Sequence, residues 1–116
     1  MGNESSDLLR GTLTTLVLSL LASKRLYGYE IAKEIRERTD GLLHLKEGSL
    51  YPALHAMERA GLLNAEWVEA GQGPKRKYYL LTRKGRRVLA ERASSWRRFR
   101  DAVDTIVTTQ PEGGTA

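Results

Sequence analysis

Residues 46–61 read KEGSLYPALHAMERAG, and this stretch decides how the rest of the chain is interpreted. On a helical wheel that begins at Ser49 and ends at Ala60, the apolar residues share one face, at the spacing of a helix packed on a core. The opposite face is short, polar and aromatic. We expect Gly48 or Ser49 to cap this helix, Pro52 to lie in its first turn and Gly61 to end it. A one-sided helix with hydrogen-bonding groups near its N-terminus has the shape that enters a DNA major groove.

Two helices are expected before this stretch. Apolar residues at helical spacing predict the first over residues 8–23, after a polar segment, residues 1–7, that we expect to be flexible. The second begins near Tyr27 and runs to about Thr39, and Gly41 supplies the positive φ that ends it. Tyr27 and Tyr29 are expected to pack at the helix start and in the core. The second helix and the helix of residues 49–60 then form a candidate helix-turn-helix pair.

After Gly61 the apolar pattern changes from a period of 3.6 residues to a period of 2. Residues 64–69 and 75–81 are two strand-like runs, and residues 70–74 between them are a turn-forming cluster, so the pair predicts a β-hairpin. Trp67 is expected to pack on this hairpin. Lys75, Arg76 and Lys77 directly follow the turn, which predicts a wing with a basic tip that reaches the DNA backbone or the minor groove.

A final helix is expected from Thr82, as its cap, to about Thr109. Its apolar residues fit a heptad repeat that Arg92 interrupts, and this seam predicts a homodimer interface; the interface residues are Leu89, Trp96, Phe99, Val103 and Ile106. Residues 110–116 are expected to be a disordered tail. The chain therefore divides into a flexible start (1–7), a winged helix-turn-helix region (8–81), a dimerisation helix (82–109) and the tail, an α+β fold that is mainly helical.

The composition excludes several classes of protein. A chain of 116 residues is long enough for one ordinary domain. Its 19 Lys and Arg against 14 Asp and Glu give a formal charge of +5, which favours an anionic partner. It has no cysteine, so a disulfide framework, a thiolate nucleophile and a Cys-ligated metal are excluded. The longest apolar run, residues 16–22, is too short for a membrane span, and we expect a cytoplasmic protein without a membrane partner.

Four segments resemble the PadR family of bacterial transcriptional regulators, in the same order and at similar spacing. They are LYGYEI (26–31), GSLYPAL (48–54), MERAGLL (57–63) and KYYLLTRKG (77–85). The resemblance covers roughly residues 8–106. It implies a winged helix-turn-helix repressor that dimerises through its C-terminal helix and binds a palindromic operator, and whose family members often respond to a small aromatic effector. The single C-terminal helix is similar to that of the small subfamily, which has no separate effector domain.

The candidate DNA contacts differ by chemistry. Ser49 and the free N–H groups of the first helical turn suit a phosphate, and Lys46 just before them is a further phosphate contact. Tyr51 and His55 can donate to a phosphate or a base, and the ring of Pro52 can pack on a thymine methyl group. The full set is Lys46, Ser49, Tyr51, Pro52, His55, Lys75, Arg76 and Lys77. The alternative for all of them is an ordinary solvated surface.

Some features of the sequence also fit functions other than DNA binding. Trp96 and Phe99 are interface core or, alternatively, a platform for a flat hydrophobic effector, and core is the commoner use of aromatic residues at heptad spacing. A winged helix used for protein–protein contact would bind DNA weakly and without selectivity. An enzyme is not expected, since the chain has no nucleophile elbow, carboxylate pair or dinucleotide motif. His44 and His55 are not at metal-ligand spacing, so we expect neither a metal nor another cofactor.

Overall fold

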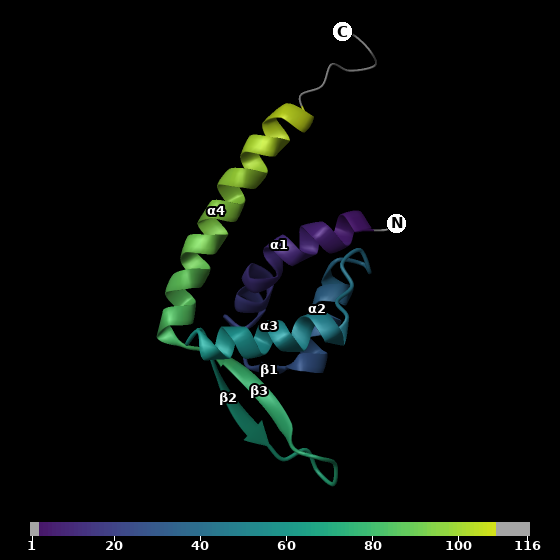
Figure 1. Ribbon diagram of the computed structural model, residues 1–116, viewed down its shortest axis with the longest axis vertical. Helices are drawn as coiled ribbons and strands as arrows, with labels where there is room; N and C mark the ends of the chain where they lie inside the picture. Colours follow the sequence, from purple (N-terminus) through teal and green to yellow (C-terminus); the bar gives the residue numbers. More distant parts are fainter. Residues whose placement is uncertain (1–2, 109–116) are drawn as a thin grey trace.

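The computed structural model describes residues 3–108, with side chains from residue 12 onwards. This part of the chain forms four helices and a three-stranded antiparallel sheet, which confirms the predicted mainly helical α+β fold. The elements follow in the order α1 (Asn3–Leu20), β1 (Leu26–Tyr27), α2 (Gly28–Arg38), α3 (Glu47–Arg59), β2 (Leu63–Val68), β3 (Arg76–Leu81) and α4 (Arg83–Val107). Figure 1 shows α1, α2 and α3 gathered on one side of the sheet, with the β2–β3 hairpin extending away from them.

Helix α1 supplies the centre of the core, where Val17 and Leu18 are fully buried. The helix begins at Asn3, earlier than the predicted start near Leu8, so most of the segment that we expected to be flexible is helical. Residues 1 and 2 lie outside the described residues, as does the predicted tail.

Helices α2 and α3 form the predicted helix-turn-helix pair. Helix α2 buries Ile31 and Ile35 and ends where predicted, because Gly41 takes a φ of 82° and its N–H donates to the Arg36 carbonyl at 2.7 Å. Residue Asp40 before it also has a positive φ, of 51°. The connection from Gly41 then leads into α3 through Leu45, which is buried in the shared core.

The start of α3 differs from the prediction. Lys46, not Gly48 or Ser49, is the N-cap, with extended backbone angles (φ −88°, ψ 149°) and no side-chain cap bond. Pro52 therefore lies two or three residues further into the helix than expected, at a position where other residues would donate to the carbonyl of Gly48. The early start gains from the Glu47 carboxylate in the first turn. The proline ring faces solvent, and α3 continues past it without the hydrogen bond from residue 52 to the carbonyl of residue 48.

The end of α3 matches the prediction. Gly61 has a φ of 82° and its N–H donates to the Glu58 carbonyl at 3.0 Å, while the Leu62 N–H donates to the Met57 carbonyl at 2.9 Å. These two bonds are a Schellman motif, which satisfies the last carbonyls of the helix and turns the chain sharply. The chain can then enter β2 beside the helix it has just left.

The sheet has the strand order β1-β3-β2, and the β2–β3 pair is the predicted hairpin. Its register pairs Leu63 with Leu81 and Trp67 with Lys77. The short strand β1, which the sequence pattern did not predict, pairs Leu26 with Tyr79 of β3. Tyr79 is 2% exposed and anchors the sheet on the helical core.

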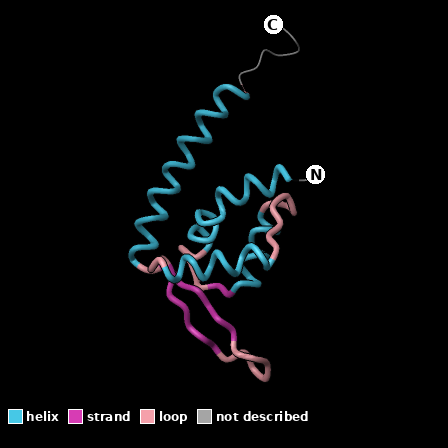
Figure 2. The backbone as a smooth tube through the Cα atoms, in the orientation of Figure 1, coloured by secondary structure: helices cyan, strands magenta, loops and turns pink. Residues whose placement is uncertain are grey.

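Helix α4 begins as predicted at Thr82, whose hydroxyl oxygen accepts a hydrogen bond from the Gly85 N–H at 2.9 Å. Its first turns lie against the domain, and the rest extends well beyond it, as Figures 1 and 2 show. This projection gives the described chain principal extents of 63 × 30 × 22 Å. Within residues 3–108, no helix has the length and hydropathy needed to cross a membrane.

A first prediction concerns Gly85, where α4 starts against the turn between α3 and β2. A Cβ at this position would lie 2.3 Å from the Leu62 carbonyl oxygen, a backbone atom that cannot rotate away. We expect Gly85→Ala to lower the free energy of unfolding by about 2–3 kcal/mol, as overpacking does. Urea unfolding at one fixed protein concentration measures this loss.

Gly48→Ala is the matched control for this substitution. Position 48 is helical, and a Cβ there would have no atom within 4 Å. Alanine should leave stability unchanged or raise it by up to about 1 kcal/mol, because it restricts the unfolded chain. Equal losses in the two variants would contradict the close approach at Gly85.

Candidate nucleic-acid interface

Helix α3 buries Leu50, Leu54 and Met57, each 4% exposed or less, and this burial turns the opposite face to solvent. Four of the five residues predicted here as DNA contacts are exposed: Lys46, Ser49, Pro52 and His55. Since Lys46 is the N-cap, it and Ser49 lie at the N-terminal end of the helix, where the first backbone N–H groups have no carbonyl four residues earlier to bind. The Ser49 N–H donates instead to the Lys46 carbonyl at 3.0 Å. This end of α3 offers cationic and hydrogen-bonding groups to an anion.

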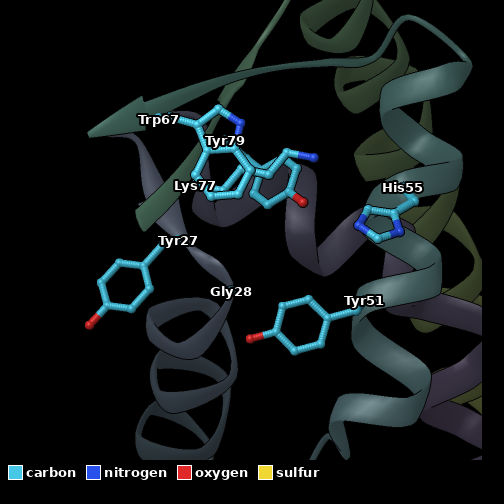
Figure 3. Close-up of a pocket in the computed structure, with 7 residues that line it drawn as sticks. All are labelled: Tyr27, Gly28, Tyr51, His55, Trp67, Lys77 and Tyr79. Atoms are coloured by element: carbon cyan, nitrogen blue, oxygen red, sulfur yellow. The ribbon is translucent and has the colours of Figure 1, made fainter. Parts of the chain in front are cut away.

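The fifth predicted residue, Tyr51, lies elsewhere. Its side chain is half-buried and points from α3 toward the start of α2, as Figure 3 shows. A Cβ at Gly28 would lie 2.5 Å from the Tyr51 ring, so the absence of a side chain at Gly28 makes room for the ring. Burial and then the Glu47 carboxylate raise the pKa of the Tyr51 phenol, because both disfavour the phenolate. The ring is therefore part of the packing between α2 and α3.

The tip of the β2–β3 hairpin carries two of the three predicted cations in the open. Lys75 and Arg76 are exposed, and the Arg76 guanidinium lies 4.7 Å from the centroid of the Tyr27 ring. A guanidinium stacked on a ring keeps its N–H groups at the edge, so Arg76 can still donate to a phosphate. On the same side of the sheet, the Arg25 guanidinium lies 4.9 Å from the Tyr78 centroid and forms an ion pair with Glu66.

Lys77 is not at the tip. It lies in β3, and its Nζ is 3.1 Å from Oε1 of Glu58, which is in the last turn of α3. The hydrogen bond to Glu58 raises the pKa of the Lys77 ammonium, although partial burial acts in the opposite direction. The stabilisation that this raised pKa represents is therefore present at neutral pH and is lost as the pH rises through the raised pKa.

A hollow of about 260 Å³ lies between α3 and the hairpin. Figure 3 shows the side chains around it, which come from α3, the start of α2 and both hairpin strands. They are Tyr27, Gly28, Tyr51, His55, Trp67, Lys77 and Tyr79. Aromatic rings from four elements, β1, α3, β2 and β3, thus surround a space that is open to solvent.

Two aromatic residues that we had expected to pack are exposed. Trp67 is 64% exposed, because its strand position points it toward the hollow beyond the reach of the core. Tyr29 is 57% exposed, because Gly28, Ile31 and Ile35 form the buried face of α2 and Tyr29 lies off that face. Its ring stacks on Tyr27 instead, at a centroid distance of 6.2 Å. Tyr27, the N-cap of α2, is half-buried as expected.

Sequence reasoning missed Trp67 and Glu58 as residues of this site. A hairpin with the predicted turn at residues 70–74 pairs Trp67 with Lys77, and the structure has this register. The predicted strands therefore already placed Trp67 beside a basic residue of the wing. Glu58 had no such signal, because only the packing of α3 against the sheet brings it to Lys77.

The exposed apolar face of α4 begins after Arg92. Leu89 packs against the chain's own core, whereas the other four predicted interface residues are 42–71% exposed: Trp96, Phe99, Val103 and Ile106. Val107, which the heptad did not include, is 59% exposed beside them. The Trp96 and Phe99 rings lie 6.2 Å apart. One side of the projecting helix is therefore an apolar strip that is largely open to solvent.

The same part of the chain, residues 3–108, contains no cluster of three or more His, Cys, Asp or Glu residues that could hold a metal ion.

Comparisons with known proteins agree with this geometry. The sequence profile of the transcriptional regulator PadR-like family matches residues 17–91. A transcriptional regulator from Clostridium thermocellum is 34% identical, with a TM-score of 0.80 over 88% of this chain and 96% of that one. A PadR-like transcription factor from Bacteroides fragilis is 37% identical, with a TM-score of 0.72 over 90% and 99%. An uncharacterized protein of Lysinibacillus sphaericus is 35% identical, over 88% of this chain and 94% of that protein.

A second prediction separates the ring of Tyr51 from its hydroxyl. Tyr51→Ala removes the ring that fills the space between α2 and α3, so we expect a loss of about 2 kcal/mol or more in the free energy of unfolding. Tyr51→Phe keeps the ring and should stay within about 1 kcal/mol of the wild type. Urea unfolding compares the two variants. If Tyr51→Phe costs as much as Tyr51→Ala, the hydroxyl and not the ring supports the helix pair.

Proposed function

This chain belongs to the PadR-like family of transcriptional regulators, and on that premise we propose that it is a bacterial repressor that binds a palindromic operator as a homodimer. Members of this family are regulators that bind DNA, not enzymes. The observation that carries the proposal is that α3 and the basic hairpin border one hollow, so that both can meet the same duplex (Figure 3).

In this proposal the N-terminal half of α3 lies in the major groove. His55 and Pro52 contact bases, since an imidazole can donate to a base edge and a proline ring can pack on a thymine methyl group. Lys46 and Ser49 hold a phosphate at the helix N-terminus, where backbone N–H groups and the dipole favour an anion. Tyr51 packs beside them, and its hydroxyl is the part that reaches DNA. Lys75 and Arg76 contact the backbone at the adjacent minor groove.

The homodimer follows from the apolar strip on α4. Large apolar side chains that lie exposed along one side of a projecting helix form the kind of patch that marks an interaction site. A second copy presents the same strip, and pairing two such helices is the economical way to bury both. Two α3 helices held one helical turn of DNA apart, about 34–36 Å, would then read a palindrome.

A third prediction distinguishes backbone contacts from base contacts. Lys75→Ala with Arg76→Ala should weaken binding to the operator and to random duplex by similar factors. In a dimer that loses four phosphate contacts, the slope of log K against log salt should also become shallower by roughly 3–4. His55→Ala should instead cost about 1–3 kcal/mol more on the operator than on random DNA. Fluorescence anisotropy on duplexes from a binding selection measures all of these.

Arg97→Ala with Arg98→Ala is the matched control, because it removes the same charge from α4 and not from the wing. Its salt slope should stay close to that of the wild type. Equal losses of His55→Ala on both duplexes would remove His55 from base readout. A wild-type preference for the selected duplex far below a thousandfold would favour the alternative, a winged helix used for protein–protein contact.

A fourth prediction concerns the dimer. Phe99→Glu places a carboxylate in the apolar strip and should shift the protein toward monomer, because the charge would be buried without a partner. Thr105→Glu adds the same charge to the other side of the same helix and should leave the dimer intact. Light scattering after size-exclusion chromatography, over a range of concentrations, measures the shift.

Trp96 has two possible roles, as part of the dimer interface or as part of a surface on which a flat effector stacks. Trp96→Ala should weaken the dimer if the ring is interface core. An unchanged dimer that has lost the saturable binding of a flat aromatic dye would instead assign Trp96 and Phe99 to a hydrophobic effector bound between the subunits.

A further inference from the structure

We propose that Lys77 is a positioning residue, which joins the wing to the recognition helix α3 and sets the spacing between them, and that it does not itself contact DNA. The inference rests on the proposed DNA-binding function and goes beyond it, because it assigns a different role to one cation of the Lys75–Arg76–Lys77 cluster.

The contacts of the Lys77 ammonium carry the inference. Its Nζ lies 3.1 Å from the Glu58 carboxylate, 5.3 Å from the centroid of the Tyr79 ring and 5.9 Å from that of Trp67. These distances allow a charge-assisted hydrogen bond and two cation–π contacts. The Lys77 side chain is only 25% exposed, whereas Lys75 two residues away is open to solvent. The ammonium is thus occupied from several directions inside the protein.

The partners of Lys77 lie on three different elements. Glu58 is on α3, Trp67 is on β2, and Tyr79 is on β3 together with Lys77 itself. One side chain therefore connects the C-terminal half of the recognition helix to both strands of the hairpin. We name this set, Glu58, Trp67, Lys77 and Tyr79, the wing clamp. A two-stranded ribbon that projects from a domain is only marginally rigid, so a clamp near its middle decides where its tip lies.

The position of the tip matters because of the geometry of DNA. A helix in the major groove and a tip at the adjacent minor groove are separated by one sugar–phosphate strand, and the groove widths are set by the duplex, at about 12 Å and 6 Å. A protein that meets both grooves must hold its two elements at a matching distance. A phosphate that approached Lys77 would also approach the Glu58 carboxylate, which repels it and offsets the attraction of the ammonium.

Glu58→Gln gives a test in which the two roles differ in sign. If Lys77 contacts a phosphate, removing the Glu58 charge frees the ammonium, removes a repulsive carboxylate and strengthens binding. If Lys77 positions the wing, the same variant loosens the clamp and weakens binding to the operator, by about two- to fivefold for a partly exposed ion pair. Stronger binding by Glu58→Gln would overturn the proposal.

Lys77→Met and Lys75→Met make a matched pair on one strand, because each replaces one lysine by an uncharged side chain of similar length. We expect Lys75→Met to make the salt slope shallower by roughly 2 in a dimer, as the loss of one phosphate contact per subunit does. Lys77→Met should weaken operator binding and leave the slope near that of the wild type. In the Lys77→Met background, Glu58→Gln should have no further effect, because the two residues act through each other. A slope change as large as that of Lys75→Met would overturn the proposal.

A readout without DNA separates the failure of this inference from the failure of the proposed function. If wild-type protein shows no preference for a selected duplex, the proposed function fails, and the clamp is then judged from amide hydrogen exchange in β2 and β3. Faster exchange in Lys77→Met than in Lys75→Met supports the clamp, since it reports a looser wing. Equal exchange in the two variants overturns it.

Discussion

The packing of α3 on the core is the interaction on which the rest of the structure depends. Leu50 and Leu54 are at most 1% exposed, and their burial fixes the rotation of the helix about its own axis. Once that rotation is set, the residues a third to a half of a turn away must face solvent, and these include Pro52 and His55. The same burial that stabilises the domain therefore selects the surface that we propose meets DNA.

The structure also depends on Thr82, where the end of α3, the end of β3 and the start of α4 meet. Its hydroxyl donates to the Gly61 carbonyl at 2.7 Å and accepts from the Gly85 N–H, while its backbone N–H donates to the Leu62 carbonyl. Lys84 adds a bond from its Nζ to the Ala60 carbonyl at 2.9 Å. These bonds tie the end of α3 to the end of β3 and the start of α4. The direction in which α4 leaves the domain is thus coupled to the recognition helix, which is what a dimer needs if it is to orient two such helices.

The candidate site contains side chains that are exposed and side chains that already have a contact inside the protein. Lys46, His55 and Lys75 project into solvent, where a charge or donor is available to a ligand. Tyr51 and Lys77 are engaged by the protein itself, the first by the backbone of α2 and the second by Glu58. Both kinds appear as polar or basic residues in the sequence. Only the first kind is free to contact DNA without giving up an internal contact, so we assign the second kind mainly to spacing.

The sequence alone determined the order and type of the main elements, the helix ends at Gly41 and Gly61, the hairpin, and the apolar strip of α4, because each depends on neighbours within a few residues. It also determined which residues carry positive charge. Tertiary structure decided what local patterns do not contain: the strand β1, the exposure of Trp67 and Tyr29, the N-cap at Lys46 and the pairing of Lys77 with Glu58. Those outcomes depend on which distant surfaces meet. A periodic pattern specifies the face that a residue occupies, but only packing between elements decides whether that face is covered and by what.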